Sequence, residues 1–310
     1  MKLWKTAEAL AGKTPHTRNR YVDFLRAASI CAVVVGHWMT PAPVVEDGAL
    51  RFDHMLAFAP RSQFLTWLFQ VMPVFFFVGG YANAASWSSA QRGGVGTSSW
   101  LGKRLRRLLA PIVPLILFWS LAAFLARRSG VDVGLASHAS RLALIPVWFL
   151  AVYVMVTLAA PISYRVWRRQ GMVSFWALVA CAGLTDAIAV LFGLADIRWL
   201  NYGFIWLAMH QLGYAWREGG LERPSRAIGL ALTGLLGLTF VILFLSYPVS
   251  MVTVPGAEMS NSRPPNIALL ALGLLQVGVL LLAARPARKW LERPNVWAGV
   301  IVLNRIIMTL

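Results

Sequence analysis

Long apolar runs, each close to 20 residues, alternate along the chain with short polar segments. A helix of about 20 apolar residues is long enough to cross roughly 30 Å of hydrocarbon. We therefore expect an all-α fold: a polytopic transmembrane helical bundle over residues 22–310, preceded by a cytoplasmic N-terminal tail over residues 1–21. The predicted spans lie at about 22–40, 63–86, 108–126, 144–163, 173–194, 197–216, 227–247, 267–284 and from 297 onward.

The ninth apolar segment, VWAGVIVLNRIIMTL, reaches the last residue without a polar flank. A span without an exit flank predicts that the chain is truncated inside its ninth span. About nine spans would then be present. At about 20 residues per span plus connections, roughly 50 residues and a tenth span would follow in the intact protein.

Composition and charge support the same class of protein. The chain is 58% hydrophobic, and its formal net charge is +17. The N-terminal tail and the even-numbered loops hold 20 of the Lys and Arg residues, against 7 in the other loops. This alternation predicts a cytoplasmic N-terminus in a multi-pass protein of the plasma membrane. Because topology and attraction to anionic membrane lipids account for the charge, nucleic-acid binding is not needed to explain it. The Ala-, Arg- and Gly-rich composition suggests a bacterial source.

Three ionisable residues interrupt the first span. At 100° per residue, Asp23, Arg26 and His37 fall within about 60° of one another on one helix face. Arg26 and His37 are separated by about 16 Å along the helix axis. Asp23 and Arg26 could simply be a paired helix start, and His37 could bond a neighbouring helix. However, ionisable groups in spans usually face a protein interior or a wet cavity, which favours a functional face.

A second basic cluster, KRLRRLLAPIVP, lies at the predicted start of the third span. Arg104 and Arg107 are three residues apart and share a helix face. Ordinary basic flanking of a span would explain them. The functional interpretation is an anion clamp, since guanidinium groups suit phosphate or pyrophosphate. Pro111 and Pro114 should bend the helix just beyond the cluster.

Other polar residues within spans give weaker signals. Asp186, His210 and Gln211 are each expected to bond a neighbouring helix. Cys31 and Cys181 lie in separate spans, and their positions favour neither a disulfide nor a metal pair. Because the chain has no His/Glu pair at helical spacing and no Cys cluster, its sequence does not support a metal site.

The segment RYVDFLRAASICAVVVGHW resembles the first helix of the acyltransferase 3 family, integral membrane enzymes that O-acylate sugars and other acceptors. Arg26 and His37 match the family's Arg-x10-His pattern, and Asp23 fits an acidic position that often precedes it. Arg104 and Arg107 match its Arg-x-x-Arg pattern. MPVFFFVGGYANAASW (72–87) is similar to the family's second span. The resemblance implies ten spans and a stand-alone form without a fused extracytoplasmic domain.

The resemblance also implies a reaction. Acyl-CoA, by default acetyl-CoA, would be the donor, and Arg104 and Arg107 would bind its phosphates. His37 would act as a general base on an acceptor hydroxyl or as a transient acyl carrier. Arg26 would orient the donor or stabilise oxyanion charge, and Asp23 would fix Arg26. The acceptor would be a hydroxyl of a glycan, a glycolipid or a similar molecule at the extracytoplasmic side.

Two functions of other classes fit parts of the pattern. A secondary transporter could use Asp23, Arg26, His37 and Asp186 as a proton or anion relay. The sequence shows neither a repeated half nor a matching pair of broken spans, which weighs against transport. A membrane sensor or scaffold would leave the charged face without a role.

Overall fold

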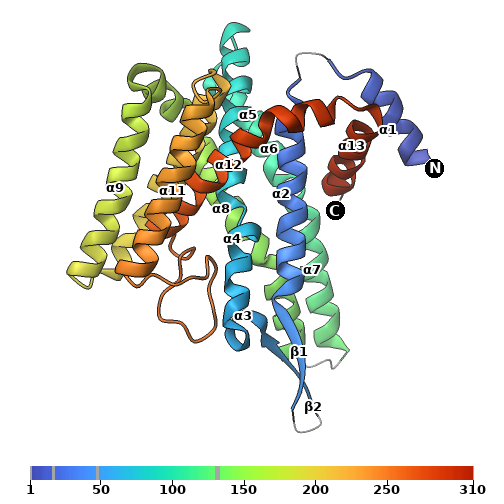
Figure 1. Cartoon of the computed structure of the whole chain (residues 1–310). Helices are drawn as coiled ribbons and strands as arrows, with labels where there is room; N and C mark the ends of the chain where they lie inside the picture. The colour runs from blue at the N-terminus through green and yellow to red at the C-terminus, as the bar shows by residue number, and fades with distance from the viewer. Residues whose placement is uncertain (1, 16–17, 47–48, 130–132, 310) are drawn as a thin grey trace. The chain divides into compact units, whose positions relative to one another are not determined.

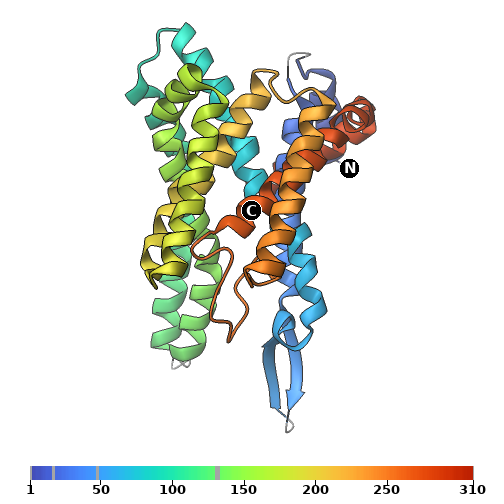
Figure 2. The same ribbon diagram turned by 60° about the vertical axis from the view of Figure 1, so that its left-hand side comes forward.

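The fold is that of a polytopic helical membrane protein, as the apolar runs predict. A computed structural model describes residues 2–15, 18–46, 49–129 and 133–309, and two views of it are given in Figures 1 and 2. Its elements in chain order are α1 (Lys2–Gly12), α2 (Arg20–Met39), β1 (Pro41–Glu46), β2 (Ala49–His54), α3 (Met55–Phe58), the 3-10 helix η1 (Pro60–Leu65), α4 (Thr66–Phe69), α5 (Met72–Arg92), α6 (Thr97–Leu109), α7 (Ile112–Arg128), α8 (Val133–Gln170), α9 (Met172–Leu191), the 3-10 helix η2 (Ala195–Leu200), α10 (Asn201–Arg217), α11 (Pro224–Phe244), α12 (Ile267–Leu291) and α13 (Pro294–Thr309).

In the described part of the chain, seven helical segments are long and apolar enough to cross a membrane. The sixth and ninth predicted spans also form helices, α10 and α13, but with 17 and 16 residues these are shorter than the other seven. The prediction of nine spans is therefore confirmed for seven. These seven segments are Arg20–Met39, Pro60–Arg92, Thr97–Ala126, Trp148–Gln170, Met172–Leu191, Pro224–Phe244 and Ile267–Leu291.

The chain forms two compact units. The first unit contains Met1–Tyr81 and Gln170–Leu310, and the second contains Ala82–Arg169. The first unit therefore includes α1 to α4, the start of α5, and α9 to α13. The second unit includes the end of α5 together with α6, α7 and most of α8.

The core of the first unit is built around α10, in which twelve of the 17 residues are buried. Gly80 of α5 and Gly213 of α10 meet where these two helices cross. A Cβ atom on Gly80 would overlap the His210 carbonyl oxygen, and one on Gly213 would overlap the Phe77 carbonyl oxygen. Small residues allow this close backbone approach, as they do in many membrane helix pairs. The crossing aligns the start of α5 against the most buried helix of this unit.

The predicted N-terminal tail contains a helix, α1, that packs against α13 within the first unit. α1 lies beside α13, as Figure 1 shows. The indole Nε1 of Trp297 on α13 donates a hydrogen bond of 2.9 Å to the Thr14 hydroxyl. The guanidinium of Arg20 lies over the same indole ring, 5.2 Å from its centroid. These contacts place the segment just before α2 against α13.

A two-stranded antiparallel hairpin follows α2, and the sequence prediction did not include it. β1 and β2 pair in a register that runs from Pro41 opposite His54 to Glu46 opposite Ala49. Figure 2 shows the hairpin extending beyond the end of α2. The otherwise all-α fold therefore carries a short β element directly after the helix that bears His37.

In the second unit, the helix is interrupted near Pro111, where the sequence predicts a bend. α6 ends at Leu109, and Pro111 is the N-cap residue of α7, which begins at Ile112. Proline suits the start of a helix because its missing N–H would have no intrahelical acceptor there. The basic Arg-x-x-Arg cluster consequently belongs to a separate helix, α6, that precedes the apolar helix α7.

Candidate functional site

The start of α2 is fixed by its N-cap residue. The Asn19 side-chain oxygen accepts hydrogen bonds from the backbone N–H groups of Tyr21 and Val22, at 3.2 and 3.4 Å. Such a cap satisfies N–H groups that have no partner within the helix. The Asn19 amide also donates to the Tyr81 hydroxyl at 3.1 Å. The first turn of α2, which carries Asp23, is thereby tied to α5.

Asp23 is buried and lies between two arginines. Arg18 Nε donates to Asp23 Oδ2 at 2.6 Å, whereas Arg26 Nη1 lies 3.9 Å from Oδ1. The side chains of Arg18 and Arg26 are 56% and 42% exposed, so both guanidinium groups remain accessible. The hydrogen bond to Asp23 raises the pKa of the Arg18 guanidinium. The expected pairing of Asp23 with Arg26 is therefore looser than the pairing with Arg18, a residue that the sequence analysis did not single out.

His37 lies in the last turn of α2 and is exposed. Its Nδ1 is 2.8 Å from the carbonyl oxygen of Val33, one turn earlier in the helix. Because a carbonyl oxygen only accepts, this contact assigns the proton to Nδ1 and leaves a lone pair on Nε2 in the neutral ring. The Thr40 hydroxyl donates to the His37 carbonyl oxygen at 2.9 Å and closes the helix end. The local geometry therefore presents Nε2 as a basic nitrogen.

Arg26 and His37 are held on one continuous helix, Arg20–Met39. Their spacing of eleven residues corresponds to about 16 Å along the axis and about 20° around it. This distance exceeds the reach of an arginine side chain. The two residues can therefore contact different parts of one extended ligand, but they cannot both contact the same reacting atom.

Arg104 and Arg107 lie on α6 in the second unit. Arg104 is partly buried: its Nη2 donates to the Ala82 carbonyl oxygen at 3.2 Å, and its guanidinium lies 5.6 Å from the centroid of the Trp100 ring. Arg107 is exposed. The two arginines of the motif consequently differ, since Arg104 is bonded to the middle of α5 and Arg107 is exposed.

Comparison with known protein families decides the class of protein. The sequence profile of the acyltransferase 3 family, which describes an acyltransferase domain, matches residues 19–309. The chain belongs to the acyltransferase 3 family. The match spans almost the whole chain and both units, so this member of the family is a membrane acyltransferase of the EC 2.3.1 type. Comparisons with curated proteins and with solved structures find no match.

In this acyltransferase, Asp186 on α9 is a buried carboxylate, and both of its oxygens have bonding partners. Its Oδ2 accepts from the Ile267 backbone N–H at 2.7 Å and from the Tyr247 hydroxyl at 3.3 Å. Its Oδ1 accepts from the Asn201 amide at 3.1 Å and lies 3.4 Å from Arg198 Nε. These contacts join α9 to η2, to the first residue of α10, to the loop after α11 and to the first residue of α12. They confirm the expectation that Asp186 bonds neighbouring elements.

His210 and Gln211 on α10 are also buried within the first unit. Nδ1 of His210 is 2.9 Å from the Tyr214 hydroxyl, one turn later on the same helix. The Ser174 hydroxyl of α9 donates to Gln211 Oε1 at 3.0 Å. His210 is 0% exposed, whereas His37 is exposed. In this acyltransferase, the accessible histidine of the two lies at the end of α2.

Proposed function

We propose that this acyltransferase moves an acetyl group from cytoplasmic acetyl-CoA to a hydroxyl of a glycan or glycolipid at the extracytoplasmic side of a bacterial plasma membrane. The observation that carries the proposal is the hydrogen bond from His37 Nδ1 to the Val33 carbonyl. It leaves an exposed basic nitrogen on the same helix face as Arg26. Membership of the family supports the acyl-transfer chemistry, and this geometry supports His37 as the base.

In the proposed reaction, His37 Nε2 takes the proton from the acceptor hydroxyl. The acceptor oxygen then attacks the thioester carbonyl carbon and forms a tetrahedral intermediate. The C–S bond breaks, the CoA sulfur leaves as a thiolate, and the imidazolium returns the proton to it. His37 lies in the last turn of α2, so the imidazolium forms at the end of this helix between these steps. The products are an ester on the acceptor and free CoA.

Arg26 is proposed to hold the donor rather than the oxyanion. Its distance of about 16 Å from His37 along the helix suits contact with the pantetheine arm or a phosphate when the thioester lies at His37. Asp23 would then limit the positions of the Arg26 guanidinium, and Arg18 would neutralise the rest of the Asp23 charge. In this proposal the three residues position the donor, while proton transfer belongs to His37.

The α6 arginines are proposed to bind the phosphates of the donor. Arg107 is exposed on a helix, TSSWLGKRLRRLL, that contains four basic residues and no acidic residue. Guanidinium groups bind phosphate through charge-assisted hydrogen bonds. The distribution of Lys and Arg among the loops supports a cytoplasmic location for this helix, which is where acyl-CoA is found.

The test uses intact cells that express the protein and are fed a labelled acetyl precursor. Envelope glycans and glycolipids are separated, and the label released by mild alkali is measured because it reports O-acetyl esters. We expect label in one of these fractions with the wild type and with Trp38→Ala, a matched variant of a neighbouring residue that is 77% exposed. We expect none with His37→Ala.

Two outcomes would overturn parts of the proposal. Release of CoA by the purified protein, with no alkali-labile label in any glycan or glycolipid fraction, would show that the acceptor class is wrong. Equal labelling by His37→Ala and the wild type would show that the reaction does not require His37.

A further inference from the structure

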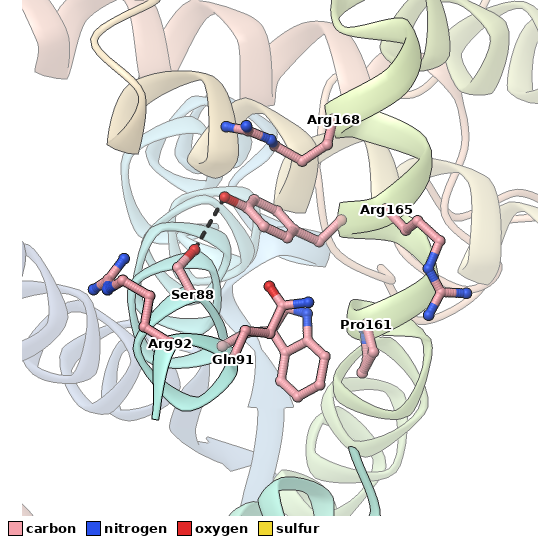
Figure 3. A pocket seen from close by; sticks show the side chains of 8 residues that line it. Ser88, Gln91, Arg92, Pro161, Arg165 and Arg168 are labelled. Atoms are coloured by element: carbon pink, nitrogen blue, oxygen red, sulfur yellow. Dashed lines mark hydrogen bonds between the residues drawn. The ribbon is translucent and has the colours of Figure 1, made fainter. Parts of the chain in front are cut away.

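A cavity in the second unit lies away from the Arg-x-x-Arg arginines. It has a volume of about 410 Å³ and lies between the last two turns of α5 and the end of α8. This volume is within the range of small-molecule sites. Figure 3 shows the labelled side chains around it, with Ser88, Gln91 and Arg92 on one helix and Pro161, Arg165 and Arg168 on the other.

The floor of the cavity is aromatic. Trp87 and Tyr164, which are 5% and 9% exposed, line it together with the buried Pro161. The Ser88 and Tyr164 hydroxyls are hydrogen-bonded at 3.1 Å and join the two helices at this point, as the dashed line in Figure 3 shows. An aromatic floor held in this way can stack on the flat face of a base.

The rim of the cavity is cationic. Arg92, Arg165 and Arg168 are exposed, and none of the eight described lining residues is acidic. The charge of the surrounding sequence agrees, since residues 82–169 contain eleven basic residues and a single acidic residue, Asp132. Figure 3 shows the three guanidinium groups pointing to different sides of the cavity. Such a rim can contact more than one phosphate oxygen of a ligand seated on the floor.

The Arg-x-x-Arg motif is connected to this cavity through two tryptophans. Arg104 lies over the Trp100 ring, and the Trp100 and Trp87 ring centroids are 5.2 Å apart. The Trp100 indole donates to the Ser86 hydroxyl at 2.9 Å, one residue before Trp87. Besides the contact with the donor phosphates proposed above, Arg104 therefore supports the aromatic floor through Trp100.

We propose that this cavity binds the 3′-phosphoadenosine end of the acyl-CoA donor. The adenine would stack on the aromatic floor formed by Trp87 and Tyr164, and the 3′-phosphate would contact Arg165 and Arg168. The inference rests on the proposed function, because it assumes that acyl-CoA is the donor. The phosphate of an anionic lipid headgroup has the same charge chemistry. The aromatic floor and the hydroxyl and amide groups of Ser88 and Gln91 favour the nucleotide.

The experiment measures binding by calorimetry with the full-length protein in nanodiscs of phosphatidylcholine. The probes are CoA, 3′-dephospho-CoA and 4′-phosphopantetheine. We expect the wild type to bind CoA more tightly than 3′-dephospho-CoA, and 4′-phosphopantetheine least. The double variant Arg165→Gln/Arg168→Gln should bind CoA about tenfold more weakly for each arginine replaced, and it should no longer distinguish CoA from 3′-dephospho-CoA.

The control is Arg169→Gln, which removes one positive charge, as each replacement in the double variant does, from an exposed neighbour outside the cavity. This variant should keep both the CoA affinity and the preference for the 3′-phosphate. Because these arginines are exposed, the variants should fold, and a thermal unfolding curve checks this. A loss of preference in Arg169→Gln equal to that in the double variant would show that overall charge is responsible, and it would overturn the site.

The remaining outcomes separate this inference from the proposed function. If the double variant binds CoA as the wild type does, the cavity assignment is wrong, while CoA remains the donor. If CoA affinity is unchanged but less phosphatidylglycerol copurifies with the double variant, the cavity is a lipid headgroup site and the nucleotide assignment is overturned. If the wild type binds no CoA, the cavity assignment and the proposed donor both fail.

Discussion

Two polar clusters in the first unit look alike in the sequence and differ in the structure. Each centres on an aspartate within an apolar span, Asp23 on α2 and Asp186 on α9, and each has an arginine within ion-pair distance. The side chain of Asp186 is 1% exposed, and its partner Arg198 is only 15% exposed. The partners of Asp23 are arginines that remain half-exposed. The difference lies in whether the charged groups can still reach a ligand.

Burial of the partner, more than burial of the carboxylate, distinguishes the Asp186 cluster from the α2 cluster for which we propose a function. The Asp186 cluster is closed by a backbone N–H, a hydroxyl and an amide from separate segments. A buried charge without such partners would be very costly. On α2, the accessible groups are guanidinium groups and the imidazole of His37, which are the groups that bind anions and move protons.

The largest expected effect is on catalysis at the end of α2. His37→Ala should reduce acetyl transfer by roughly 10²- to 10⁴-fold, the usual contribution of a general base. Because His37 is exposed, the thermal unfolding midpoint of the variant should stay close to that of the wild type. A steady-state assay of CoA release with acceptor present measures the change in rate. A large loss of stability in His37→Ala would show that His37 has a structural role, as the Asp186 cluster does, and would contradict the comparison.

The second prediction concerns stability at the Asp186 cluster. Asp186→Ala should destabilise the protein by about 3–5 kcal/mol, since it leaves Arg198 buried without its charge partner. Thermal unfolding in detergent measures this change. The fraction that remains folded should keep its transfer activity, because Asp186 takes no part in the proposed reaction. Loss of activity at full stability would contradict the structural role and favour a relay through Asp186.

The third prediction concerns Arg26. Arg26→Ala should raise KM for acetyl-CoA about tenfold, the effect of removing one charge-assisted hydrogen bond to the donor, and should leave kcat within a few-fold of the wild type. Arg26→Lys should restore part of the affinity because it restores the charge. Steady-state kinetics with acetyl-CoA as the varied substrate measure both constants. A fall in kcat with unchanged KM would instead show that Arg26 stabilises the transition state.

The smallest expected effect is at Arg18. Arg18→Gln should lower stability by about 0.2–1 kcal/mol, since pairs with an exposed partner are weakened by solvent. Without Arg18, Asp23 should pair more closely with Arg26. The KM of the variant for acetyl-CoA should therefore change only slightly. Kinetics and unfolding of Arg18→Gln, compared with Lys13→Gln as a charge control in the same N-terminal segment, measure both effects.

Much of the fold could be predicted from the sequence because lipid imposes a simple constraint. Apolar runs of about 20 residues predict helices, and seven such helices are present in the described chain. The interruption of the helix near Pro111 follows from the bend that the sequence predicts there, since proline lacks a backbone N–H and disfavours the helical conformation of the residue before it. The hairpin after α2 was missed because the prediction followed apolar runs of about 20 residues, and each strand has only six residues. The Asp47-Gly48 pair between the strands was the available signal, as this dipeptide is typical of hairpin turns.

The sites could be predicted only where their residues share one helix. Asp23, Arg26 and His37 follow from helical periodicity alone. The tautomer of His37 depends on its χ angles, and the close contact of Arg18 with Asp23 depends on how the chain enters α2; neither follows from residue spacing. The cavity on the second unit joins Arg92 with Arg165 and Arg168, more than 70 residues later. Only tertiary structure brings such residues together.

The most direct test of the central claim is where the acetyl group is found during a single turnover. Wild-type protein and His37→Ala are mixed with radiolabelled acetyl-CoA and acceptor, quenched in acid within one turnover, and the label on protein and acceptor is counted. With His37 as general base, the wild type should place label on the acceptor alone, and His37→Ala should transfer almost none. Label bound to His37 of the wild type, or full transfer by His37→Ala, would contradict the account.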